Sequence, residues 1–140
     1  MRTRAKILCV DDQLSGLEGR KMLLEECGFE VLSAASGATA LELFSSHRFD
    51  LVLLDYHMPE MNGDVVAERM KAARPHIPVL MLSADEDVPE STLQSVDAFV
   101  SKNESPASLI EVVEHALELH HLFRPISELE KGRDSSQRIA

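Results

Sequence analysis

Short apolar runs alternate with longer helix-period segments along most of this chain. The runs are continuously apolar, as in KILCV (6–10) and LVLL (51–54), which is typical of strands that are covered on both faces of a sheet. Strands that alternate with helices form βαβ units and a parallel sheet. The sequence therefore predicts an α/β fold with strands at 6–10, 29–34, 50–55, 78–82 and 98–101 and helices at 14–27, 37–46, 63–73, 89–95 and 106–121.

The length and the pattern allow one domain. The 140 residues suit a single domain with its own core, and we expect that domain to span residues 1–122. Beyond Leu122 the helical periodicity fades and the stretch KGRDSSQRIA is polar. Such a composition favours a flexible tail or a linker at 123–140.

Composition excludes several classes of function. The formal net charge is −10, which disfavours direct binding to nucleic acid or to an anionic membrane. No apolar stretch approaches the roughly 18 residues of a membrane span. Cys9 and Cys27 have neither metal nor redox spacing, and we expect both to be reduced core thiols in a cytoplasmic protein.

Polar residues that can do chemistry cluster at the carboxyl ends of the expected strands. In an open parallel sheet, ligands bind at this edge. Three carboxylates, a hydroxyl and an ammonium are therefore expected to converge there. These groups belong to Asp11, Asp12, Asp55, Ser83 and Lys102.

Three clustered carboxylates need compensating charge, because two unit charges 4 Å apart repel by about 4 kcal/mol at an effective dielectric constant of 20. Lys102 offsets one charge, and a hard divalent cation such as Mg²⁺, which prefers oxygen ligands, offsets more. An acid, a hydroxyl and a lysine beside Mg²⁺ are the parts of a phosphoryl-transfer site. Asp55 is the natural nucleophile, since aspartate can form an acyl phosphate.

Four segments together resemble the receiver domain of two-component response regulators: DD (11–12), LVLLDYHMPEMNG (51–63), IPVLMLSA (77–84) and DAFVSK (97–102). The resemblance covers residues 6 to about 121. It implies a flavodoxin-like (βα)5 three-layer sandwich with sheet order 2-1-3-4-5. It also implies a signalling domain, not an enzyme, whose Asp55 is phosphorylated by a sensor histidine kinase or a phosphotransfer protein with Mg²⁺.

The resemblance assigns metal ligands. Asp12 and Asp55 match the carboxylates that bind Mg²⁺ directly, and the backbone carbonyl of His57 matches the third protein ligand. Asp11 matches the residue that holds a metal-bound water. The side chains of His57 and Asp85 match positions that flank the water attacking the acyl phosphate, so we expect this pair to tune dephosphorylation.

It also assigns the switch. The Ser83 hydroxyl, the Ala84 N–H and the Lys102 ammonium match groups that bind phosphoryl oxygens, and Phe99 matches the aromatic residue that turns inward when Ser83 moves. The expected output surface is the face of the fourth helix, fifth strand and fifth helix, roughly residues 86–120. The output partner is not named by the sequence, and a phosphorylation-dependent homodimer stays open.

The chain departs from the family pattern at Asn103, where most members have proline after the lysine. The stretch FVSKNESPASLIEVV resembles receivers that precede a DNA-binding domain, so the chain is either a single-domain regulator or part of a longer one. Two other classes stay open. One is a constitutive protein-binding module, and the other is a phosphatase acting through an aspartyl phosphate, which is disfavoured because His57 stands where such enzymes need an acid.

Overall fold

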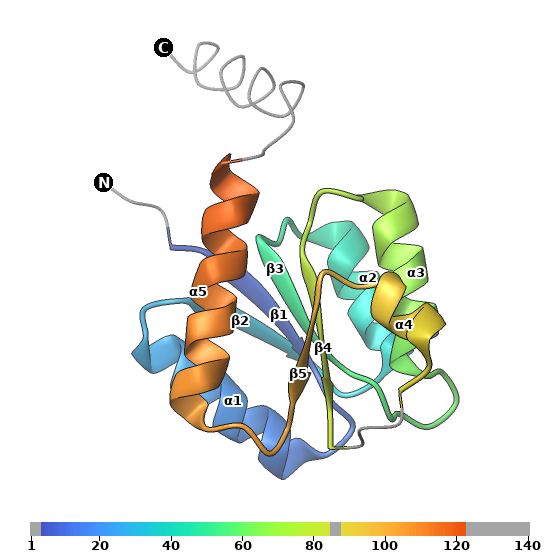
Figure 1. The fold of residues 1–140 in the computed structure, drawn as a ribbon, viewed down its shortest axis with the longest axis horizontal. Coiled ribbons are helices and arrows are strands. Elements are labelled where there is room, and N and C mark those ends of the chain that lie inside the picture. Colours follow the sequence, from blue (N-terminus) through green and yellow to red (C-terminus); the bar gives the residue numbers. More distant parts are fainter. Residues whose placement is uncertain (1–3, 85–87, 123–140) are drawn as a thin grey trace.

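The computed structural model describes residues 4–84 and 88–122 of the chain. Strands and helices alternate throughout, and the strands form one five-stranded parallel sheet in the order β2-β1-β3-β4-β5 (Figure 1). The strands are β1 (Lys6–Val10), β2 (Glu30–Ala34), β3 (Leu51–Asp55), β4 (Val79–Ser83) and β5 (Ala98–Ser101). The helices are α1 (Leu14–Glu26), α2 (Gly37–Ser46), α3 (Gly63–Ala73), α4 (Glu90–Gln94) and α5 (Pro106–Leu122). The predicted fold class and strand order are confirmed.

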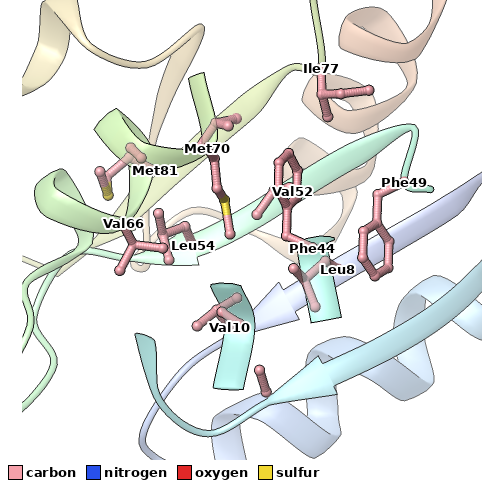
Figure 2. Close-up of a cluster of buried hydrophobic side chains, with 14 of the residues drawn as sticks. Leu8, Val10, Phe44, Phe49, Val52, Leu54, Val66, Met70, Ile77 and Met81 are labelled. Atoms are coloured by element: carbon pink, nitrogen blue, oxygen red, sulfur yellow. The ribbon is translucent and has the colours of Figure 1, made fainter. Parts of the chain in front are cut away.

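Helices cover both faces of the sheet, which gives three layers. Helices α1 and α5 lie on one face, and α2, α3 and α4 lie on the other (Figure 1). Each face has its own apolar core, and alternate residues of a strand enter different cores. Leu8 and Val10 pack in the core under α2 and α3 (Figure 2), whereas Ile7 and Cys9 pack in the core under α1 and α5. Strands β1, β3 and β4 are buried on both faces, which explains their continuous apolar runs.

Helix ends follow local chemistry. The Ser36 hydroxyl accepts a hydrogen bond from the Thr39 N–H at 3.1 Å, and the Ser105 hydroxyl accepts one from the Ser108 N–H at 3.2 Å. Each bond satisfies a backbone donor in a first helical turn. Gly28, with φ of +95°, follows α1 in the left-handed region that favours glycine.

The two cysteines differ, and the expectation for one of them is wrong. Cys9 is buried, and burial raises the pKa of its thiol to about 11. Cys27 is exposed, because it lies just beyond α1 where the chain turns toward β2. None of the helices in the described part of the chain has the length and apolar character needed to cross a bilayer.

Candidate functional site

Three carboxylates meet at the carboxyl edge of the sheet, as predicted. Asp55 is the last residue of β3, and Asp11 and Asp12 directly follow β1. One carboxylate oxygen from each residue lies within 4.8 Å of the others. Asp11 and Asp55 are 1% and 2% exposed, whereas Asp12 is more exposed. Burying charges so close together requires cations beside them.

Lys102 supplies one of those cations. Its Nζ lies 3.0 Å from Oδ1 of Asp55 and 3.2 Å from Oδ2 of Asp11, so the ammonium bridges the two buried acids. The Lys102 N–H donates to the Ser83 carbonyl at 2.9 Å and extends the β4–β5 ladder by one residue. The backbone therefore places the lysine at the end of β5, two strands away from Asp55 on β3 and three from Asp11 after β1. The Lys102–Asn103 peptide is trans.

Arg20 supplies a second cation that the sequence reasoning missed. Its guanidinium forms a salt bridge with Oδ2 of Asp11, and its side chain is 16% exposed. A signal was present in the sequence. Arg20 lies three residues after Leu17 and four before Leu24, the two buried apolar residues of α1, so the guanidinium comes from the helix face that packs on the sheet.

The alternation of side chains along each strand explains which of them meet. Leu51 and Leu53 enter the core under α1 and α5, so Asp55, two residues further along, projects toward the same face. Val100 also enters that core, which places Lys102 on this face. Asp55 and Lys102 thereby meet next to α1, the helix that carries Arg20.

Ser83 and Phe99 fall on the opposite face. Met81 packs in the core under α2 and α3, and Phe99, its Cα partner on β5, packs against that core. Ser83, two residues after Met81, is 1% exposed, and Ala84 is exposed. The proposed switch pair therefore shares the face of the sheet that carries α4. Asp85 lies outside the described residues.

The loop from β3 to α3 starts with two backbone bonds. The Tyr56 N–H donates to the Leu82 carbonyl at 2.9 Å, and the Gly63 N–H donates to the Tyr56 carbonyl at 2.8 Å. The His57 side chain is exposed, and its ring meets the Tyr56 ring edge-on with centroids 4.7 Å apart. Within the loop, Glu60 has φ of +68°. These bonds fix the main chain beside Asp55.

The two buried acids have pKa values shifted in opposite directions. Burial raises the pKa of Asp55 above its usual value, and the nearby charge of Asp11 adds to that rise against the opposing effect of Lys102. Burial also acts to raise the pKa of Asp11, but the Gln13 N–H and the charges of Arg20 and Lys102 outweigh it, so the pKa of Asp11 is lowered. The electrostatic environment favours ionised Asp11 and disfavours ionised Asp55.

The opposite shifts predict stability changes of opposite sign at neutral pH in metal-free buffer. A raised native pKa means that Asp55 contributes less stability as pH rises through that value, so Asp55→Asn should increase the free energy of unfolding by on the order of 1 kcal/mol. A lowered native pKa means that Asp11 contributes stability at pH values above its pKa in the unfolded chain, which is about 3.9. Asp11→Asn should therefore decrease the free energy of unfolding by about 1–3 kcal/mol. Urea unfolding with a chelator present measures both.

Repeating the urea unfolding of both variants over a range of pH checks this prediction. The advantage of Asp55→Asn should vanish as pH falls below the raised pKa of Asp55, because the wild-type acid is then neutral as well. The deficit of Asp11→Asn should persist until pH falls below about 4 and through the lowered native pKa of Asp11. Destabilisation of equal size in both variants would contradict the assignment of the two environments.

Comparison with known proteins gives one consistent answer. The family model "Response regulator receiver domain" matches residues 7–114. The transcriptional regulatory protein GlrR of Escherichia coli K12 is 32% identical over 117 residues, which are 81% of this chain and 26% of GlrR. The chain thus spans about a quarter of that relative's length.

Two solved structures share the fold at significant identity. A CheY-like receiver domain protein from Methanospirillum hungatei has a TM-score of 0.80 at 27% identity, covering 85% of this chain and 98% of that one. TrrA from Thermotoga maritima, solved in complex with Mg²⁺-BeF, has a TM-score of 0.77 at 31% identity, covering 80% and 98%. With the sheet order and the acidic edge described above, the matches show that this chain belongs to the response regulator receiver domain family.

Proposed function

We propose that this chain is a phosphorylation-activated signalling switch, with residues 1–122 as the receiver domain, and that Asp55 accepts the phosphoryl group. The observation that carries the proposal is the position of Asp55. Its carboxylate ends a fully buried strand, lies among two further carboxylates, and is 3.0 Å from the Lys102 ammonium. A nucleophilic oxygen and a cation that can bind the arriving phosphoryl group are therefore already in contact.

The donor set fits Mg²⁺, because carboxylate and carbonyl oxygens are its preferred protein ligands. The more exposed Asp12 and the buried Asp55, with the His57 carbonyl, would hold the ion directly, and Asp11 would hold one of its waters. When bound, Mg²⁺ would neutralise charge on the phosphoryl oxygens. The complex of the relative TrrA with Mg²⁺-BeF supports a metal at this edge.

The chain's own groups account for the transfer. A carboxylate oxygen of Asp55 forms the new bond to phosphorus, while the bond between phosphorus and the donor breaks and the donor keeps the electron pair. The Lys102 ammonium, the Ser83 hydroxyl and the Ala84 N–H bind the phosphoryl oxygens. His57 and Asp85 would tune the later hydrolysis.

The output follows from the two faces of the sheet. Lys102 approaches Asp55 from the face of α1 and α5, whereas Ser83 and Phe99 lie on the face that carries α4. Movement of Ser83 toward a phosphoryl group would change the packing around Phe99, next to β5 and α4. We propose that partner binding changes at the surface of α4, β5 and α5.

Membership of the family supports a proposal for the partners and the compartment. The donor is a sensor histidine kinase or a phosphotransfer protein, and the output partner is a protein rather than a nucleic acid, in keeping with the net charge of −10. A homodimer formed on phosphorylation is one form that this output can take. We place the chain in the cytoplasm, where such kinases present their phosphohistidine and where thiols such as the exposed Cys27 stay reduced.

The intact mass of the protein after incubation with acetyl phosphate tests this function. With Mg²⁺ present, we expect the mass to increase by one phosphoryl group. With a chelator in place of Mg²⁺ the increase should be lost, because the carboxylates then repel the anionic donor. A phosphotransfer assay with a phosphorylated histidine kinase domain supplies a second donor. Failure with both donors would favour a constitutive protein-binding module.

A further inference from the structure

Arg20 brings a permanent positive charge into the acidic cluster. Its guanidinium forms a salt bridge with Oδ2 of Asp11, an atom that also lies 3.2 Å from Nζ of Lys102. Oδ1 of Asp11 accepts a hydrogen bond from the Gln13 N–H at 2.9 Å. Both oxygens of Asp11 are therefore engaged by groups of the protein.

Gly16 lies beside this ion pair. A Cβ atom at Gly16 would lie 3.5 Å from Nη2 of Arg20 and 3.6 Å from Oδ2 of Asp11, in van der Waals contact with both atoms of the ion pair. The guanidinium of Arg20, which belongs to the next turn of α1, therefore lies next to the backbone at Gly16. Beside it is a cavity of about 440 Å³, which is lined by Gly16, Gly19 and Lys102 among others. That space can receive the Arg20 side chain if it leaves Asp11.

These contacts determine the balance of charge within the carboxylate cluster. Two cations, Arg20 and Lys102, stand against the three carboxylates. Most of the repulsion that would otherwise draw in a divalent cation is thus already offset by the chain itself. A cation that enters the cluster is also repelled by the guanidinium, unless Arg20 moves into the neighbouring cavity.

We propose that Arg20 is an internal counter-ion that stabilises the metal-free cluster and weakens Mg²⁺ binding, so that this receiver responds to Mg²⁺ concentration less readily than its carboxylates alone would allow. The inference rests on the proposed function, because it takes the carboxylate cluster to be the Mg²⁺ site. It makes Arg20 a positioning residue that acts on the metal through Asp11.

Calorimetric titration of the full chain with MgCl₂ tests the inference. Arg20→Gln should bind Mg²⁺ roughly tenfold more tightly than wild type, because one positive charge leaves the cluster. Its unfolding midpoint should fall in chelator and rise further than that of wild type when Mg²⁺ is added. Tighter binding is informative, because a variant that had merely lost structure would bind the ion more weakly.

Two control variants separate charge from structure. Lys21→Gln removes the same charge from the neighbouring residue of α1 and should leave the Mg²⁺ affinity within about twofold of wild type. Arg20→Lys keeps the charge and should stay near the wild-type affinity. The fluorescence of Tyr56, the single tyrosine in a chain without tryptophan, gives an independent binding signal next to Asp55.

The outcomes distinguish this inference from the function on which it rests. If wild type binds Mg²⁺ and Arg20→Gln binds it equally or more weakly, Arg20 is not a competing counter-ion, and only the inference is overturned. If neither protein binds Mg²⁺, the metal-dependent function is overturned together with the inference.

Discussion

The Asp55→Asn protein will carry no phosphoryl adduct after incubation with Mg²⁺ and acetyl phosphate. An amide cannot form the acyl phosphate, and the neighbouring acids cannot replace Asp55. Asp11 is held by Gln13, Arg20 and Lys102, and Asp12 is the more exposed member, outside the contact with Lys102 that the two buried acids share. We expect the adduct to fall by at least about 10²-fold, as when an essential nucleophile is removed. Intact mass measurement reads the loss directly.

A matched acid on the same segment provides the control. Asp50 lies just before β3, at the opposite edge of the sheet, where it accepts a hydrogen bond from the Lys6 N–H at 2.8 Å. Asp50→Asn should keep the wild-type adduct although it changes an acid directly beside the same strand. An adduct of undiminished size in Asp55→Asn would place the acceptor on another residue and would remove the central assignment.

Gly63→Ala should have the largest effect on stability of any conservative change near the site. A Cβ at this position would lie 2.5 Å from the Asp55 carbonyl and 3.0 Å from both the Tyr56 Cα and the Met81 Sδ. Two of these neighbours are backbone atoms, so no change of rotamer can relieve the overlap. We expect a loss of about 1–3 kcal/mol in the free energy of unfolding and a decrease of roughly 3–10 °C in the thermal midpoint.

Another glycine of the chain should give the opposite sign. A Cβ at Gly19, within α1, would meet nothing within 4 Å, so Gly19→Ala should gain about 0.5–1 kcal/mol from helix propensity. Denaturant unfolding of the two variants side by side separates steric overlap from a general effect of alanine. A Gly63→Ala protein as stable as wild type would show that β3 and α3 can move apart, and the backbone would then not position Asp55 rigidly.

Much of the fold could be predicted because burial of the strands requires a pattern of apolar residues that is visible in the sequence. Strands covered on both faces must be apolar throughout, and all five expected strands occur within one residue of their predicted ends. The stop and start signals were equally direct, as at Gly28 and at Ser105 before α5. The acidic edge followed from the same reasoning, since the carboxyl ends of parallel strands share one side of the sheet.

The spacing of Arg20 from Leu17 and Leu24 placed it on the inner face of α1, but the pattern could not predict its contact with Asp11. A charged residue in a helix is ordinarily solvated, and its inward direction depends on how α1 packs on β1. The position of the guanidinium next to Gly16 is likewise a property of packing, and the sequence alone identifies glycine there only as a weak helix former. The prediction that Cys27 lies in the core was wrong for a related reason, because the exact end of a helix decides whether its last residues face the core or the solvent.

Because the two cores lie on opposite faces of the sheet, the residues of each strand alternate between them with a period of two. Inserting one residue into β5 ahead of Phe99 would turn both Phe99 and Lys102 to the face opposite their present one, whereas inserting two would shift them along the strand but keep their faces. The same alternation of side chains therefore determines both the two cores and the site at the edge of the sheet. Insertions that lengthen a loop leave this alternation unchanged, but an insertion within a strand preserves it only when the number of added residues is even.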